Sequence, residues 1–353
     1  MSPRHKTRVW DGRPVNGPRT VPAALRRLVR PPRRPQASRL MVFAGRSHEE
    51  LAVAIAARLG IELGAVELDT FANGETYCRY GESVRGADVF LVQSCSTPVN
   101  DRLVELLVMA NAARLASARR VTAVMPWFPY SRQDKKSAPR EPITARLVAD
   151  LLEAAGVDRV MTMDLHAGQI QGFFRIPVDH MTALPLFAAH FRRAVTGPVV
   201  AVSPDLGRVK LARRLATMLE CDIAVVTKAR PRHDVAEAAA VIGDVAGKTA
   251  VIGDDMIVTG GTLLAAADAV QAAGALEVRA FATHALFARD ALASLTASQI
   301  VEVAITDTVS LGPATRSPAL TVLSVADLLA RSIENGFEEV SVSSVFAGLN
   351  ELF

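Results

Sequence analysis

The sequence contains few aromatic residues, few cysteines and no long apolar run. Phenylalanine, tyrosine and tryptophan together make up 5% of the 353 residues. The three cysteines, Cys78, Cys95 and Cys221, are widely spaced and form no Cys-x-x-Cys pair. An odd number of isolated cysteines favours neither a disulfide framework nor a zinc site, and it indicates a reducing, cytoplasmic location. Because no apolar stretch is long enough to cross a bilayer, we expect no membrane partner.

Charge is distributed unevenly along the chain. Residues 1–40 hold eleven lysine and arginine residues and one acid, Asp11, a net charge of +10. The whole chain carries +4, which leaves −6 for residues 41–353. Because the body of the protein is acidic, we expect no nucleic-acid partner.

Residues 1–39 are predicted to be a basic leader, and three interpretations of this leader stay open. Arginine and proline dominate this stretch, which fits a disordered tail. An organelle-targeting peptide is also rich in arginine and poor in acids, but it is usually richer in serine and poorer in proline. The third interpretation is a start codon assigned too early, with the natural chain opening at Met41. We favour a tail or a misplaced start over targeting.

From Leu40 onward, short apolar runs alternate with segments of helical periodicity. Half of all residues are hydrophobic and the length allows about two domains, so the pattern predicts an α/β fold with mostly parallel sheets. A domain boundary is expected near Thr182. Ligands of such folds bind at the carboxyl ends of the strands. Five candidate residues each follow an expected strand: Arg132, His166, Asp205, Lys228 and Asp254.

One stretch, residues 249–262, carries the clearest chemical pattern. The apolar run 250–252 predicts a buried strand, with the carboxylates of Asp254 and Asp255 at its end. The segment Thr259-Gly260-Gly261-Thr262 follows, and the alanine-rich residues 263–273 predict a helix. Glycine backbone amides, threonine hydroxyls and a helix N-terminus suit a phosphate group, while paired carboxylates suit the hydroxyls of a sugar. The pattern therefore indicates a site for a phosphorylated pentose.

Seven motifs occur in order along the chain, and together they resemble the ribose-phosphate diphosphokinase family. They are FANGE (71–75), ESVRG (82–86), YSRQDKK (130–136), DLHAGQIQGFF (164–174), VSPD (202–205), DDMIVTGGT (254–262) and SVSSVF (341–346). The resemblance covers residues 40–346. It implies two phosphoribosyltransferase-like domains, residues 40–181 on the ATP side and 182–339 on the ribose 5-phosphate side. The C-terminal segment 340–353 is expected to complete the first domain.

The family resemblance implies a reaction and a set of site residues. The reaction transfers the diphosphoryl group of ATP to the anomeric hydroxyl of ribose 5-phosphate, giving phosphoribosyl diphosphate and AMP, with Mg²⁺ as cofactor. His166 and Asp205 match metal positions. His166, Lys228 and Arg230 match catalytic positions. Ribose 5-phosphate is expected on Arg230, Asp254, Asp255, Thr259, Gly260, Gly261 and Thr262.

The resemblance also implies contacts that extend beyond one chain. ATP-binding positions match Phe71, Asn73, Gly74, Glu75, Arg132 and Gln133, and in the family the first four come from a neighbouring subunit. A homo-oligomer, a hexamer by the resemblance, is therefore expected. Positions of a regulatory phosphate site match Ser83, Arg85, Arg140, Ser341 and Ser343.

One position departs from the family pattern, and it keeps two alternatives open. Val258 stands where the family usually has aspartate, immediately before the Thr-x-Gly-Thr segment. A catalytically impaired regulatory member of the family would lose such residues, although His166 and Lys228 are present. A phosphoribosyltransferase would share the loop at 254–262 but would not need the motifs at 130–136 and 164–174. A P-loop kinase is excluded because residues 243–249 are one residue short of its motif and precede a strand.

Overall fold

The computed structural model describes residues 39–229, 238–312 and 317–346. All of these belong to one compact unit. The predicted leader, Arg230 and the end of the C-terminal segment lie outside the described residues. None of the helices among the described residues is long and apolar enough to cross a membrane.

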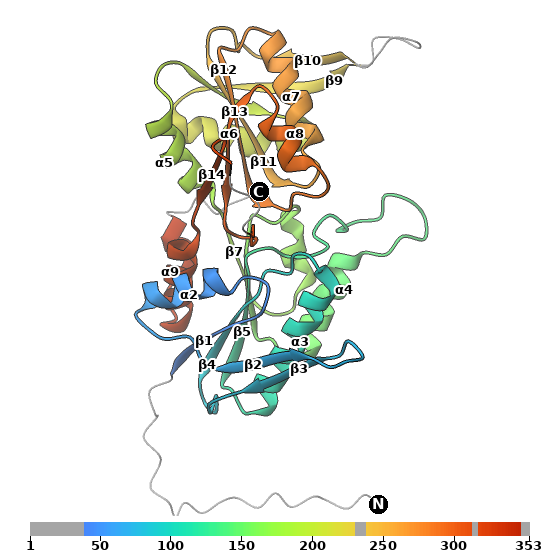
Figure 1. Ribbon diagram of the computed structural model, residues 1–353, viewed down its shortest axis with the longest axis vertical. Coiled ribbons are helices and arrows are strands. Elements are labelled where there is room, and N and C mark those ends of the chain that lie inside the picture. Colours follow the sequence, from blue (N-terminus) through green and yellow to red (C-terminus); the bar gives the residue numbers. More distant parts are fainter. Residues whose placement is uncertain (1–38, 230–237, 313–316, 347–353) are drawn as a thin grey trace, which may run out of the picture. The chain divides into compact units, whose positions relative to one another are not determined.

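The first sheet is entirely parallel, because the chain between its successive strands is long enough to cross over the sheet (Figure 1). Its order is β1 (Leu40–Ala44), β4 (Asp88–Val92), β5 (Arg120–Met125), β6 (Arg159–Met163) and β7 (Val178–Met181). Helices α2 (Glu49–Leu59), α3 (Val99–Leu115) and α4 (Thr144–Ala154) belong to this part, as do the hairpin strands β2 (Val66–Thr70) and β3 (Thr76–Tyr80).

Alternate residues of these strands face opposite helices. On β4, Val89 and Leu91 share a core with α3 and α4, whereas Phe90 and Val92 share a second core with α2. This alternation is the two-residue period of a strand buried on both faces. For that reason, the residues of such a strand are almost all apolar.

The second sheet has the order β10-β9-β8-β11-β12-β13-β14, and only its edge strand β10 is antiparallel. The strands are β8 (Val199–Ser203), β9 (Asp222–Ala229), β10 (Ala238–Ile242), β11 (Thr249–Ile257), β12 (Glu277–Ala285), β13 (Ile300–Thr306) and β14 (Leu320–Leu323). Helices α5 (Leu184–Ala194) and α6 (Val209–Leu219) pack on one face, and α7 (Gly261–Ala272) packs on the other. The short helix α8 (Ala291–Thr296) precedes β13.

The last helix, α9 (Ala326–Phe337), returns to the first sheet and packs against α2 (Figure 1). Its Ile333 lies in one continuous core with residues of both sheets, among them Phe90 and Phe281. The helix approaches β6 closely at Gly336, where an added Cβ would lie 2.7 Å from Cε of Met161, the flexible end of that side chain. The two sheets are therefore joined by a shared core.

The predicted α/β fold is confirmed, and three local expectations are corrected. Asp254 and Asp255 lie inside β11, because the strand continues to Ile257. Lys228, expected in a polar loop, belongs to β9 and pairs with Ala239 of β10. Strands β3 and β10 were not predicted, since TYCRY carries polar residues and AAAVI resembles a helix by composition.

Candidate active site

Strand β11 places the two carboxylates near the carboxyl ends of the strands of the second sheet. It lies between β8 and β12 and runs parallel to both, so its carboxyl end meets theirs. The side chains of Asp254 and Asp255 are only 14% and 7% exposed. Two adjacent carboxylates at this depth require positive or hydrogen-bonding partners, because burial of an uncompensated charge is costly.

Their environments push the pKa values of the two carboxyls apart. Burial, together with the negative charge of Asp255, raises the pKa of Asp254 to about 7. Burial alone would also raise the pKa of Asp255, but the hydrogen bond from His166 and the charge of Arg208 outweigh it and hold that pKa below its usual range. Asp255 is therefore the carboxyl that stays ionised.

The glycine–threonine segment forms the turn into α7. Gly260 caps the helix with φ of 77°, a left-handed conformation that a side chain disfavours. The helix then begins at Gly261, so the backbone N–H groups of its first turn have no partner within the helix. These amides and the hydroxyls of Thr259 and Thr262 form a site suited to an anion.

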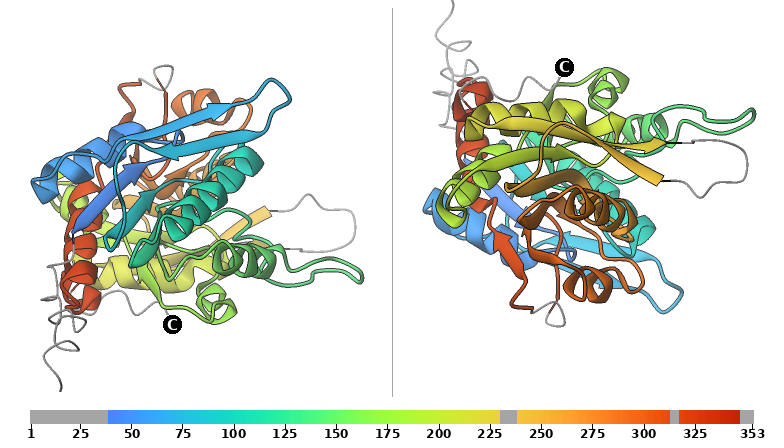
Figure 2. Two further views of the ribbon diagram at one scale, coloured as in Figure 1. Left: turned by 90° about the horizontal axis from the view of Figure 1, so that it is seen from below. Right: turned by 90° about the horizontal axis from the view of Figure 1, so that it is seen from above.

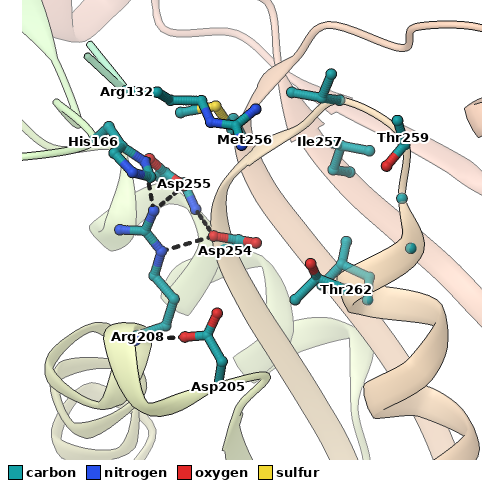
Figure 3. A pocket seen from close by; sticks show the side chains of 14 residues that line it. Arg132, His166, Asp205, Arg208, Asp254, Asp255, Met256, Ile257, Thr259 and Thr262 are labelled. Atoms are coloured by element: carbon teal, nitrogen blue, oxygen red, sulfur yellow. Dashed lines mark hydrogen bonds and ion pairs between the residues drawn. The ribbon is translucent and has the colours of Figure 1, made fainter. Parts of the chain in front are cut away.

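His166 and Asp205 come from two different strand ends. His166 follows β6 of the first sheet, and its Nδ1 lies 2.8 Å from Oδ2 of Asp255 on the second sheet. Asp205 follows β8, and its Oδ1 accepts backbone N–H bonds from Gly207 at 2.8 Å and from Arg208 at 3.1 Å. Within the described part of the chain, the second carboxylate oxygen of Asp205 has no partner of this kind, and it faces the cavity (Figure 3).

Arg208 is a member of the site that sequence reasoning missed. Its Nε donates to Oδ1 of Asp254 at 2.8 Å, and its Nη2 donates to Oδ1 of Asp255 at 2.6 Å. Nη2 also lies 2.8 Å from Nδ1 of His166. The available signal was an arginine three residues after Asp205, at the amino end of the next helix.

These residues line one cavity of about 210 Å³ (Figure 3). The carboxylate pair, His166 and Arg208 lie at one end, and Thr259 and Thr262 lie at the other. Arg132 reaches the same cavity from the first sheet. A larger neighbouring cavity of about 570 Å³ shares these charged residues and adds Lys135, Gln169 and Lys210. The structure thus brings together nine predicted residues: Arg132, His166, Asp205, Asp254, Asp255, Thr259, Gly260, Gly261 and Thr262.

The other predicted ATP residues lie elsewhere on the chain. Gln133 lines a separate cavity of about 520 Å³, together with Arg132 and Val258. Residues 71–75 form the exposed turn between β2 and β3, and Phe71 is 55% exposed. Gly74 and Glu75 border a further cavity, of about 570 Å³, that includes Arg46 and Asn100. Within one chain this turn does not reach the cavity of His166.

The remaining predicted residues lie on separate segments. Lys228 stands near the end of β9, and the ends of β9 and β10 project to the same side as the loop between β5 and α4 (Figure 2). The five residues predicted for regulation are exposed: Ser83, Arg85, Arg140, Ser341 and Ser343. None of them lines either cavity next to His166 among the residues that the structure describes.

A buried polar network joins the two sheets beneath the site, and it too was not predicted. Oδ2 of Asp164 accepts from Oγ1 of Thr283 at 2.7 Å and from the backbone N–H of Ala183 at 2.9 Å. The fully buried ring of His284 has its Nε2 3.1 Å from the carbonyl oxygen of Met163, and it lies tilted against Trp127 at 4.8 Å between ring centroids. This network holds the end of β6, and hence His166, against β12.

The donor set at the cavity suits a hard cation only in part. His166 and Asp205 border the same cavity as Asp254 and Asp255. No group of three histidine, cysteine or acidic side chains in the described ranges is arranged to hold a metal by itself. Mg²⁺ keeps several waters and binds through one or two carboxylates plus substrate phosphates, so a shared site of this kind fits these residues.

Parallel sheets that join a carboxylate pair to a threonine–glycine turn define a protein of the phosphoribosyltransferase-type fold. A family model described as the N-terminal domain of ribose phosphate pyrophosphokinase matches residues 40–156, and one described as a phosphoribosyl synthetase-associated domain matches residues 218–347. The chain belongs to the ribose-phosphate pyrophosphokinase family, another name for the diphosphokinases, as the sequence motifs predicted.

The chain matches nearly the whole length of individual relatives. The chain is 48% identical to the ribose-phosphate pyrophosphokinase of Fusobacterium nucleatum over 86% of this chain and 97% of the relative. It is 48% identical to that of a Nostoc species over 87% of this chain and 94% of the relative. The crystal structure of phosphoribosylpyrophosphate synthetase from Mycobacterium smegmatis matches with a TM-score of 0.81 and 44% identity, over 86% of this chain and all of that chain.

Proposed function

We propose that this chain is a ribose-phosphate diphosphokinase, which transfers the diphosphoryl group of ATP to the anomeric hydroxyl of ribose 5-phosphate. The observation that carries this proposal is the cavity with a carboxylate pair at one end and a threonine–glycine helix start at the other. Those two ends suit the hydroxyls and the phosphate of one small sugar phosphate. Membership of the family supports the same reaction.

The sugar phosphate is assigned to residues of the second sheet. Thr259, Gly260, Gly261 and Thr262 would bind the 5-phosphate through backbone amides and hydroxyls. Asp254 and Asp255 would accept hydrogen bonds from the ring hydroxyls. Fixing both ends of the sugar orients the anomeric hydroxyl, and such positioning can supply a large share of the rate enhancement.

The transfer step forms one bond and breaks another at the β-phosphorus of ATP. The anomeric oxygen bonds to that phosphorus, the bond to the α,β-bridging oxygen breaks, and AMP leaves with the bonding electron pair. The hydroxyl proton is released to solvent or to a basic group. His166, Lys228 and Arg230 are proposed to stabilise the charge on the phosphoryl oxygens during transfer.

Mg²⁺ is the proposed cofactor, with His166 and Asp205 as the residues that would hold it. When bound, it would neutralise phosphate charge and polarise the phosphoryl group. Because Oδ1 of Asp205 already accepts two backbone N–H groups, the side chain is held in one orientation. That orientation leaves the other oxygen directed into the cavity (Figure 3).

ATP is assigned to Arg132 and Gln133 on this chain and to Phe71, Asn73, Gly74 and Glu75 from a second copy. The exposure of the 71–75 turn and its separation from the cavity support a homo-oligomer, in which one chain completes the nucleotide site of another. Ser83, Arg85, Arg140, Ser341 and Ser343 stay a prediction for a regulatory phosphate site.

The proposal is tested by incubating the protein with MgATP and ribose 5-phosphate and resolving the products by phosphorus NMR. Phosphoribosyl diphosphate and AMP in equal amounts are expected. ADP instead of AMP would identify an ordinary kinase, and no turnover would identify an impaired family member. Thr262→Val serves as a matched variant, because it removes one hydroxyl at similar side-chain volume and should raise KM for ribose 5-phosphate.

A further inference from the structure

Arg208 is seated on the two carboxylates that the sugar is expected to use. Its side chain is only 18% exposed and contacts both Asp254 and Asp255. It lies in the turn that leads from Asp205 into α6. This turn follows β8, whereas the two carboxylates lie on β11. Figure 3 shows the guanidinium beside His166 and the carboxylate pair, on the side of the pair away from Thr259 and Thr262.

The contacts of Arg208 occupy acceptor sites on both carboxylates. Oδ1 of Asp254 accepts from Nε of Arg208 and from the backbone N–H of Asp255, each at 2.8 Å. In Asp255, Oδ1 accepts from Arg208 and Oδ2 lies 2.8 Å from the ring of His166. Among the described residues, three of the four carboxylate oxygens therefore have a protein partner, and the fourth belongs to Asp254.

Arg208 occupies acceptor sites that a vicinal diol would use. Two neighbouring hydroxyls donate two hydrogen bonds and each carboxylate oxygen accepts about two, so Oδ1 of Asp254 is filled and one site is taken on each oxygen of Asp255. With Arg208 in place, Asp255 is engaged on both sides. Release of the guanidinium would return Oδ1 of both Asp254 and Asp255 to a ligand.

Arg208 and Asp255 compete for a hydrogen bond with the same ring nitrogen of His166. Nδ1 of His166 lies 2.8 Å from Asp255 and also 2.8 Å from Nη2 of Arg208. One ring nitrogen either donates or accepts, so it can hydrogen-bond only one of these two groups at a time. When Nδ1 of His166 donates to Asp255, it cannot accept a hydrogen bond from Arg208. Moving Arg208 away then costs less free energy.

We propose that Arg208 is a competitor for ribose 5-phosphate, a side chain that occupies the carboxylate pair until the sugar hydroxyls displace it. The inference rests on the proposed function, since it takes the sugar of that reaction as the displacing ligand. Arg208 also lines the larger neighbouring cavity, so its guanidinium has space to turn into once displaced. The residue thus sets the concentration of sugar phosphate at which the site fills.

The energetic consequence has a definite sign. Charge-assisted hydrogen bonds at low exposure are stronger than those on the surface, so displacing Arg208 costs part of the free energy of sugar binding. Removing the arginine removes that cost. Its loss should therefore tighten binding of the sugar, whereas damage to a merely structural residue would weaken it.

The test is calorimetric titration of the full chain without nucleotide or metal, at about pH 8.5, above the pKa of about 7 of Asp254. Ribose 5-phosphate and inorganic phosphate are the two probes, applied to wild type, Arg208→Ala, Arg208→Lys and Arg213→Ala. Arg213 is the matched control, because it is an exposed arginine on the same helix α6 and removes the same charge.

Arg208→Ala is expected to lower the Kd for ribose 5-phosphate about fivefold or more, with Arg208→Lys between it and wild type. Inorganic phosphate needs only the threonine–glycine turn, so its Kd should stay within about twofold in every variant. Arg213→Ala should match wild type with both probes.

Three outcomes would overturn the competitor role. They are an unchanged or weaker affinity of Arg208→Ala for ribose 5-phosphate, an equal gain for both probes, and binding of phosphate without any binding of ribose 5-phosphate. Failure of the proposed function is recognised separately. Wild type would then release no AMP, whereas the shift in Kd between wild type and Arg208→Ala needs no turnover.

Discussion

The sugar end and the nucleotide end of the proposed active site are built in different ways. At the sugar end, Asp254, Asp255 and Thr262 lie within nine consecutive residues and border one cavity. At the nucleotide end, Phe71 and Gln133 lie on different loops and border no common cavity among the described residues. The sugar end is local, since its residues are close together in the sequence. The nucleotide end is distributed, since its residues are far apart in the sequence.

The difference explains how each end is stabilised. The carboxylates are fixed by partners of the same chain, and the helix start is fixed by Gly260 in its left-handed conformation. Among the described residues, the exposed 71–75 turn is held by its own hydrogen bonds, such as Phe71 N–H to the carbonyl of Glu75 at 2.8 Å, and by the edge-on contact of Phe71 with Tyr77 at 5.7 Å between ring centroids. Under the proposed function, this turn would be completed by the nucleotide or by a second chain.

Transfer itself should depend on a third region, and Lys228→Ala should therefore have the largest effect. Removing a charge that acts on the transferring group should lower kcat at least ~100-fold, about 2.7 kcal/mol, with little change in the Kd for ATP. Stopped assays of AMP release and calorimetry with ATP measure the two quantities. Lys248→Ala is the control, since Lys248 pairs with Asp222 and Asp244 away from the cavity. If Lys228→Ala kept more than about a third of kcat, the catalytic role would be withdrawn.

A change confined to the sugar end should affect only the sugar. Gly260→Ala places a Cβ at φ of 77°, at a cost of about 1–2 kcal/mol, and brings it 3.3 Å from Leu295. KM for ribose 5-phosphate should rise about tenfold while KM for ATP stays constant. Gly247→Ala is the control, because Gly247 also has positive φ but lies before β11, outside the cavity. An equal rise of both KM values would show that the two ends are not separable.

The converse change is Phe71→Ala at the nucleotide end. Loss of one aromatic stacking contact, about 1 kcal/mol, should raise KM for ATP about fivefold and leave the calorimetric Kd for ribose 5-phosphate unchanged. Leu115→Ala removes an exposed apolar side chain elsewhere in the same half of the protein and should change neither. If Phe71→Ala behaved as Leu115→Ala, the proposed contribution from a second copy would lose its main support.

The sequence predicted the local end of the site better than the distributed end. Residues 249–262 indicated a sugar phosphate without any structure, because the residues that form the pocket are close in the chain. The position of Arg208 on the carboxylates depends on the parallel pairing of β8 with β11, which no local pattern specifies. The same holds for the buried link from Asp164 to Thr283, whose partners are 119 residues apart.

The fold was predicted where apolar runs are long and failed where composition was ambiguous. Buried strands such as β4 were predicted to within a residue, since both faces need apolar side chains. The edge strand β10 was missed because AAAVI has high helix propensity, and its pairing with β9 overrides that propensity. Lys228 was expected in a loop because residues 228–234 are mostly polar, but its backbone pairs with Ala239 of β10.

Val258 lies where the two ends meet, so Val258→Asp gives the sharpest test of their separation and the smallest expected effect. It lines the cavity of Asp254 and also the cavity of Gln133, and it packs beside Trp127 and Met256. A carboxylate here would add an acceptor for the sugar hydroxyls, but it would repel the 5-phosphate if it faced Thr259.

Because Val258 immediately precedes the threonine–glycine turn and follows the carboxylate strand, we expect the acceptor effect and the repulsion to nearly cancel. KM for ribose 5-phosphate should fall or stay within about threefold, less than 1 kcal/mol, and KM for ATP should not change. Val258→Asn is the matched control, since it adds a polar group of similar size without charge. A tenfold rise in KM for Val258→Asp but not for Val258→Asn, about 1.4 kcal/mol, would place the new charge against the phosphate. The sugar end would then be arranged around a neutral residue at 258, with the 5-phosphate beside it at the threonine–glycine turn.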